Sequence, residues 1–158
     1  MKNGSLILVL IFIFPLFSYS QENKGIKLIE SFYRELYIND ITSEEIVYKY
    51  IAYSDEEQHK KAVYMVMDFR NLAIDESGHF FLFKKDIIEN NFTLSSYDTF
   101  RDVDKAKFKN LAKKKRKNVY KIDLKNTIPQ YILVENDKII SFFGFQKAGY
   151  DDYIFVVF

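Results

Sequence analysis

The chain has 158 residues, a formal net charge of +1 and no cysteine. The absence of cysteine excludes disulfides, thiolate metal ligands and a cysteine nucleophile. Hydrophobic residues make up 48% of the chain and aromatic residues 18%, so a domain of this length has enough apolar area to bury a stable core.

Residues 1–20 have the layout of a secretory signal peptide. Lys2 precedes an apolar run over 6–17, and small residues occupy the −3 and −1 positions of a cleavage site before Gln21. The run is shorter than the roughly 20 apolar residues that a membrane span needs. The sequence therefore predicts export, with one domain over 21–158 in a bacterial periplasm or outside the cell; a retained membrane anchor is the alternative.

Three helices are predicted at the start of the mature chain. Apolar residues recur at three- and four-residue steps over 24–37, which is typical of an amphipathic helix. Thr42 with Glu45, and Ser54 with Glu57, have the spacing of capping boxes. We therefore expect a second helix from Thr42 and a third from Ser54 to about residue 75.

The middle of the chain gives weaker signals. His79–Phe83 is a short aromatic run that follows a glycine, so we expect a buried strand there. The stretch 86–91 favours no particular structure. Asp98 or Asp102 is expected to cap a helix that continues to about residue 115.

The last forty residues read as antiparallel strands. Apolar and polar residues alternate over 120–125, as in a strand with one solvated face. The stretches 128–134 and 138–145 flank a turn-forming cluster and are expected to pair as a hairpin, with a final strand over 153–158. Helices followed by strands predict an α+β fold, in which the N-terminal helices pack on a curved antiparallel sheet.

A strongly basic stretch lies at 108–123. Its seven cations are Lys109, Lys113, Lys114, Lys115, Arg116, Lys117 and Lys121. The favoured interpretation is a solvated helix end, because cations are stabilised at the negative end of a helix dipole. The alternative is a docking surface for an anionic partner, such as an envelope component or an acidic protein. Nucleic acid is disfavoured, because the predicted export separates the chain from it.

No catalytic, cofactor or metal site is predicted. His59 has no second ligand four residues away, since position 63 is Val, so the pattern of a zinc helix fails. Asp151-Asp152 lacks the alternating oxygen ligands of a calcium loop. The chain contains neither a GxSxG nucleophile elbow nor a glycine-rich phosphate loop.

The abundant aromatic residues are expected to form most of the core. Some are also candidates for a pocket lining or a protein contact. The tyrosines that we select for such a contact are Tyr33, Tyr37, Tyr150 and Tyr153.

The stretch IESFYRELYINDITSEEIVYKYI, residues 29–51, resembles the opening of the NTF2-like superfamily, as does the closing YILVENDKIISFFGF. The resemblance implies a cone-shaped α+β fold with helices against a curved sheet that encloses a pocket. It transfers no catalytic residue to this chain.

Three functional hypotheses follow. The first is an exported, non-catalytic module that binds a protein or an anionic envelope component. The second is a small-ligand binder or enzyme with an aromatic-lined pocket, and the third is an inhibitor or immunity-type protein that uses the basic stretch. The sequence does not define the oligomeric state.

Overall fold

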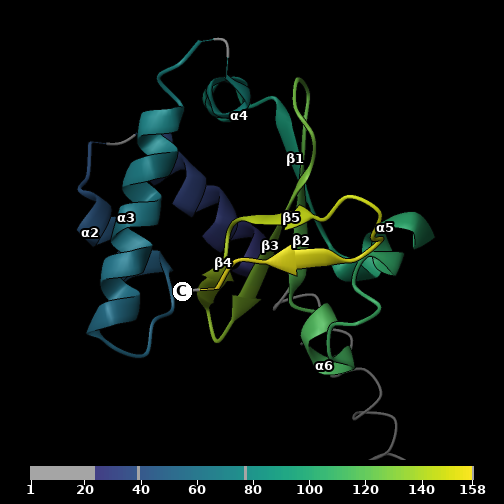
Figure 1. Cartoon of the computed structure of the whole chain (residues 1–158). Coiled ribbons are helices and arrows are strands. Elements are labelled where there is room, and N and C mark those ends of the chain that lie inside the picture. The colour runs from purple at the N-terminus through teal and green to yellow at the C-terminus, as the bar shows by residue number, and fades with distance from the viewer. Residues whose placement is uncertain (1–23, 39, 77, 158) are drawn as a thin grey trace, which may run out of the picture.

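The computed structural model describes residues 24–157 apart from residues 39 and 77, so the predicted signal peptide lies outside the described residues. Helices come first along the chain, and an antiparallel four-stranded sheet and a smaller two-stranded sheet follow (Figure 1). The predicted α+β class is therefore confirmed. Within the described residues, no helix is long and apolar enough to cross a membrane.

The helices and strands have the following bounds. The first helix covers 24–37, followed by α2 (Ser43–Tyr50), α3 (Glu56–Leu72), α4 (His79–Ile88), the short α5 (Asp102–Ala106) and α6 (Lys113–Arg116). The strands are β1 (Phe92–Ser96), β2 (Val119–Leu124), β3 (Gln130–Glu135), β4 (Lys138–Ser141), β5 (Gly144–Gln146) and β6 (Tyr153–Phe155).

The first three helices form where the sequence predicts them. At α2 the Thr42 hydroxyl accepts a hydrogen bond from the backbone N–H of Glu45, whose carboxylate accepts one from the backbone N–H of Thr42, so the capping box is confirmed. The predicted box of α3 was wrong by one residue. Asp55 is the N-cap, because its carboxylate accepts from the Gln58 N–H at 2.9 Å while the Gln58 side chain accepts from Ser54.

The strand expected at His79–Phe83 was wrong, since this stretch is the first half of α4. A five-residue apolar run does not distinguish a buried strand from a buried helix. The apolar pattern continues to Ile87, and Phe83 and Ile87, four residues apart, are both buried. The buried Asp86 fixes the helix by accepting hydrogen bonds from the backbone and side-chain N–H groups of Asn126, at 2.8 and 2.5 Å.

The single helix expected from Asp98 or Asp102 to about residue 115 was also wrong. The chain instead forms a 3₁₀ turn at Tyr97–Thr99, then α5, further turns and α6. Between the two helices the N–H groups bond three residues back, as from Phe108 to Lys105. Arg116 folds back and donates to the carbonyl oxygens of Lys109 and Leu111, which a continuous α-helix would have used for its own ladder.

The main sheet has the order β1-β2-β3-β4, with all neighbours antiparallel. The β3–β4 hairpin was predicted, and its turn residues Asn136 and Asp137 have φ values of 52° and 57°, as in the primed turns that match strand twist. The predicted second arm, 138–145, does not stay in one sheet. It leaves the main sheet after Ser141, and β5 pairs with β6 instead. β1 was not predicted.

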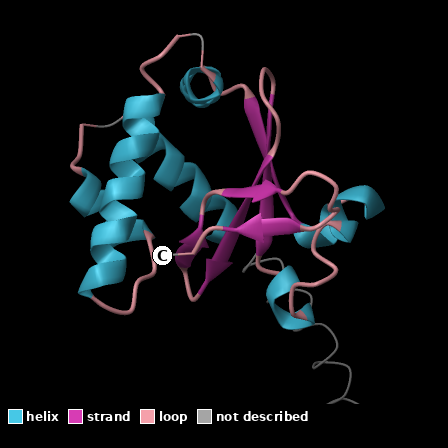
Figure 2. Cartoon of the chain, in the orientation of Figure 1, coloured by secondary structure: helices cyan, strands magenta, loops and turns pink. Residues whose placement is uncertain are grey.

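The main sheet separates two apolar clusters. Side chains alternate along β2, so that Tyr120 and Ile122 join the cluster formed with the first four helices, whereas Val119 joins a smaller cluster on the opposite face. The long helices lie to one side of the sheet, and β5, β6 and the two short helices lie to the other (Figure 2). The second face is therefore covered by short segments only.

Candidate functional site

Aromatic rings dominate the second face of the sheet. Phe108 and Tyr131 meet edge to face with ring centroids 5.0 Å apart, and Tyr131 meets Tyr153 in the same way at 4.9 Å. Phe155 stacks on Phe108 at 5.8 Å. These contacts bring the segment after α5 together with β3 and β6, and three of the rings, Phe108, Tyr153 and Phe155, line a hollow.

The hollow is a pocket with a volume of about 680 Å³. We call it the aromatic pocket. Its apolar lining consists of Phe108, Leu111, Leu133, Ile140, Tyr150, Tyr153, Ile154, Phe155 and Val157. Small-molecule sites typically enclose about 300–1,000 Å³ and combine apolar walls with a few polar groups, so both the size and the lining suit a small ligand.

Five polar side chains complete the lining: Lys107, Asn110, Lys115, Lys147 and Asp152. The Lys115 ammonium pairs with Glu135 at 3.0 Å, whereas the Lys147 ammonium lies 5.1 Å from the centroid of the Tyr150 ring. Asn110 donates to Oδ2 of Asp152 at 2.6 Å. The other oxygen of this carboxylate, Oδ1, is buried and has no hydrogen-bond partner among the described residues.

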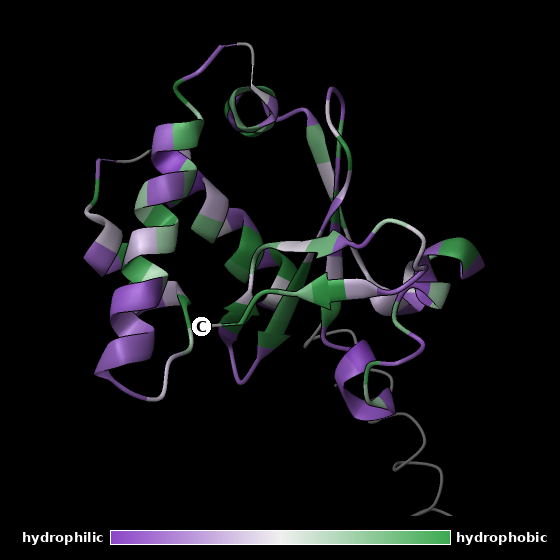
Figure 3. Cartoon of the chain, in the orientation of Figure 1, coloured by the Kyte–Doolittle hydropathy of each residue, from purple (hydrophilic) through white to green (hydrophobic). Residues whose placement is uncertain are grey.

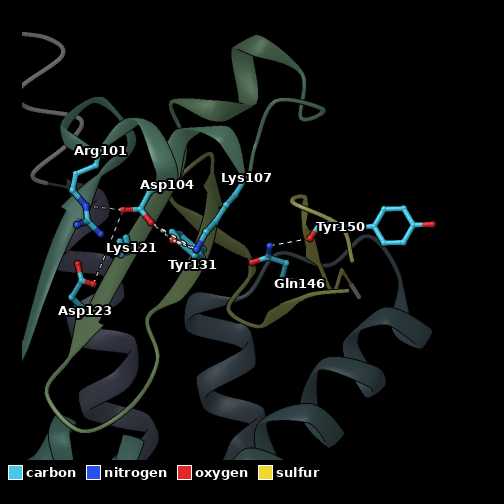
Figure 4. A network of polar contacts seen from close by, with 8 residues as sticks. All are labelled: Arg101, Asp104, Lys107, Lys121, Asp123, Tyr131, Gln146 and Tyr150. Atoms are coloured by element: carbon cyan, nitrogen blue, oxygen red, sulfur yellow. Dashed lines mark hydrogen bonds and ion pairs between the residues drawn. The ribbon is translucent and has the colours of Figure 1, made fainter. Parts of the chain in front are cut away.

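A buried polar cluster surrounds Asp104 (Figure 4), and one of its members, Lys107, also lines the pocket. Asp104 of α5 is 4% exposed. Its Oδ1 accepts from the Tyr131 hydroxyl at 2.7 Å, and its Oδ2 lies 3.2 Å from the Lys121 ammonium. Lys107 donates to the Tyr131 oxygen at 3.0 Å, and Lys121 also pairs with Asp123 at 2.8 Å. We call Asp104, Lys107, Lys121, Asp123 and Tyr131 the Asp104 cluster.

The ionisation of the Asp104 cluster follows from these contacts. Burial acts to raise the pKa of Asp104, but the hydrogen bonds from Tyr131 and Lys121 outweigh it and hold this pKa below its usual value. Burial acts to lower the pKa of Lys121, but its two carboxylate partners raise it overall. Burial and the neighbouring Asp104 raise the pKa of Tyr131 far above its ordinary value. At neutral pH Asp104 therefore stays ionised, while Lys121 and Tyr131 keep their protons.

A second cleft lies on the other side of Asp104 from the tyrosine contact. This cleft of about 330 Å³ opens beside Asp104, and its acidic and basic groups are paired with one another. Lys121 pairs with Asp104 and Asp123, and Arg101 pairs with Asp104 at 3.6 Å. Among the residues that the structure describes, no group of three or more histidine or acidic side chains is placed to hold a metal ion.

The seven cations of the predicted basic patch do not form one surface. Lys109, Lys113, Lys114 and Lys117 are exposed, and α6 is one of the most hydrophilic segments (Figure 3). Arg116 is committed to backbone carbonyls and Lys115 to Glu135. Lys121 is buried in the Asp104 cluster, because strand alternation directs it to the covered face of β2. The exposed part of the patch is therefore four lysines around α6.

The four selected tyrosines are also divided. Tyr33 is buried in the main core, where its hydroxyl donates to the carbonyl of Phe142, and it offers no surface for a partner. Tyr37 is half-buried beside Phe83. Tyr150 and Tyr153 both line the aromatic pocket, and Tyr150 is 59% exposed.

The sequence reasoning missed Asp104, Tyr131 and Asp152. Asp104 lies in a run of charged residues that suggests an exposed position. The one available signal is its spacing of four residues from the buried Phe108, which is the spacing of two residues on the same face of a helix. Tyr131 lies in a predicted strand but carries no sign that its hydroxyl meets a carboxylate. Asp152 lies in a turn-like stretch, which indicated an exposed carboxylate and not one with a buried oxygen.

Comparisons of the chain with protein-family models, with curated proteins and with solved structures found no match. The resemblance to the NTF2-like superfamily therefore stays a prediction.

Proposed function

We propose that this chain is an exported, non-catalytic binding protein that holds a small ligand in the aromatic pocket. The observation that carries the proposal is the convergence of two independently selected features at one hollow: Tyr150 and Tyr153 form part of its wall, and Lys115 of the basic stretch lies on its lining. The predicted signal peptide supports a role outside the cytoplasm. The paired charges of the Asp104 cluster support binding rather than catalysis.

The two-stranded sheet offers a matched pair of variants for testing this proposal. Phe145 and Ile154 are register partners and are similarly exposed, at 48% and 44%. Only Ile154 lines the pocket. Glutamate at either position places a charge on the same small sheet, but only Ile154→Glu brings it to the pocket.

The test uses the neutral dye Nile red, whose fluorescence rises in apolar surroundings. The protein is purified after export from a bacterial host, and the melting temperature of each variant is recorded first. Saturable enhancement is expected for the wild type and for Phe145→Glu, with a loss of at least tenfold in affinity for Ile154→Glu. No saturable enhancement, or an equal loss in both variants, overturns the proposal.

The exposed lysines support a second candidate, docking of an anionic envelope component. Lys109, Lys113, Lys114 and Lys117 make no ion pair with any described residue, so their charge is free to act on a partner. Reversing the charge of Lys113 and Lys114 should then abolish retention on an anionic matrix at physiological salt without lowering the melting temperature. Unchanged retention excludes this candidate.

A further inference from the structure

The polar groups of the aromatic pocket narrow the chemistry of its ligand, and this inference rests on the proposed function. We propose that the pocket binds a small amphipathic acid in which a hydrogen-bond donor lies between an apolar chain and a carboxylate. Three separate features of the lining carry this assignment: its apolar wall, its uncompensated cation and its buried oxygen without a partner.

The wall selects an apolar chain. It is built from the rings of Phe108, Tyr153 and Phe155 together with aliphatic side chains from β3, β4 and β6. Ile154 and Val157 are 44% and 60% exposed although both are apolar, and covering them removes apolar area from water. Such burial is worth about 25 cal/mol per Å², so an alkyl chain laid along this wall gains affinity from its length.

The cations select an acid. Lys107 points its ammonium toward Asp104 and Tyr131 (Figure 4), and Lys115 is paired with Glu135, so both cations already have partners. Lys147 makes no ion pair with any described residue and lies over the Tyr150 ring. Its charge is therefore available to a carboxylate at the edge of the pocket.

The unpaired Oδ1 of Asp152 favours a ligand with a hydrogen-bond donor. Oδ1 of Asp152 is buried without a hydrogen-bond partner among the described residues, and Asn110 already occupies Oδ2. A buried carboxylate oxygen left unsatisfied is costly, and a ligand N–H or O–H that reaches it removes that cost. A purely hydrocarbon acid would leave this oxygen unsatisfied.

Three matched probes test the assignment by calorimetry below their micelle-forming concentrations. N-dodecanoylglycine carries the chain, the amide N–H and the carboxylate. Its methyl ester lacks the charge, and N-dodecanoylsarcosine lacks the N–H. We expect the ester to bind about fivefold more weakly, because a partly exposed ion pair is lost, and the sarcosine compound about tenfold more weakly, because a hydrogen bond to a charged group is lost.

Two variants test whether Lys147 and Asp152 cause the two differences in affinity. Lys147→Gln should make the acid and the ester bind alike, and Asp152→Ala should do the same for the glycine and sarcosine compounds. Lys125→Gln, at an exposed position outside the pocket, is the control and should change nothing. Equal wild-type affinity within either probe pair overturns the inference. If Nile red still binds in that case, the proposed function stands without this ligand class; if no probe binds, both fall.

Discussion

The hydroxyl of Tyr131 donates to Oδ1 of Asp104 across 2.7 Å, while the ring of the same tyrosine packs against Phe108 at 5.0 Å. One side chain thus joins the Asp104 cluster to Phe108, which lines the aromatic pocket. This contact anchors α5 to β3, and it fixes the position of the segment that supplies Phe108 to the pocket. The buried polar cluster therefore holds in place a segment that lines the pocket.

Removing the Tyr131 hydroxyl should destabilise the fold. Tyr131→Phe keeps the ring but leaves one oxygen of a buried carboxylate without its closest donor, which costs about 1–3 kcal/mol. Tyr153→Phe is the control, since its hydroxyl donates to the neutral amide oxygen of Gln130 at 3.2 Å, and an ordinary hydrogen bond contributes only about 1 kcal/mol. Urea denaturation followed by circular dichroism measures both. A loss for Tyr153→Phe equal to that for Tyr131→Phe would contradict this account.

Acid should weaken the fold through Asp104. Its pKa in the folded state is depressed, so its contribution to stability is fully present above the unfolded-state pKa of about 3.9 and is lost as the pH falls through the lower folded-state value. Asp104→Asn should lower stability at pH 7 and flatten the decline below about pH 4. Asp102→Asn, at an exposed position of the same helix, is the matched control and should lower the stability at pH 7 less than Asp104→Asn does. Melting temperatures across the acid range test this, and parallel profiles for wild type and Asp104→Asn would refute it.

The two kinds of lysine in the basic stretch should respond differently to the same change. Lys121→Met leaves the buried Asp104 and its neighbour Asp123 without their shared cation, and breaking a buried pair in this way costs about 3 kcal/mol or more. Lys114→Met removes a solvated charge and should not change the free energy of unfolding measurably. If both variants unfold at the same denaturant concentration, the placement of Lys121 in the cluster is wrong.

Local signals predicted the elements whose structure is decided locally. The stripe of apolar residues over 24–37 and the Thr42–Glu45 box each identify a helix from adjacent residues, and Asn136-Asp137 marks the hairpin turn. In each case the stabilising partner lies within four residues or directly across a tight turn. Sequence periodicity is therefore sufficient evidence there.

Contacts between distant residues determined the parts that the sequence did not reveal. Asp86 ends up inside the protein because Asn126, forty residues away, satisfies its carboxylate. Arg116 interrupts a helix by bonding to carbonyl oxygens behind it. The pocket exists because the chain leaves the main sheet after Ser141 and returns as β5 and β6 over the second face. No residue spacing in the sequence predicts this change of sheet. Tyr150 and Tyr153 could therefore be selected only because they are aromatic residues near a predicted turn, and not because they line a pocket.

Gly25 should tolerate no side chain. A β-carbon at this position would lie 2.1 Å from the Tyr120 hydroxyl oxygen and 2.2 Å from the ring carbon that bears it. Because the ring is buried between the first helix and the sheet, it cannot move aside, and such overpacking costs about 1–3 kcal/mol. Gly25→Ala should lower the melting temperature, although alanine has the higher helix propensity. Lys24→Ala, at the exposed neighbouring position, should not. A more stable Gly25→Ala would mean that the first helix does not pack against Tyr120.

Export should depend on the apolar run over 6–17. When the full chain is expressed in a bacterial host, we expect intact-mass analysis to find a periplasmic or secreted protein that begins at Gln21. Leu10→Arg places a charge in the middle of the run, which costs about 2.5 kcal/mol or more on insertion into the membrane, so this variant should accumulate uncleaved in the cytoplasm. Lys2→Gln retains the run and should still be processed, more slowly. A wild-type chain recovered uncleaved in the membrane fraction would establish the retained anchor instead. One recovered whole from the cytosol would contradict the proposed extracytoplasmic role. Neither outcome would affect the test of the pocket, which depends on ligand binding alone.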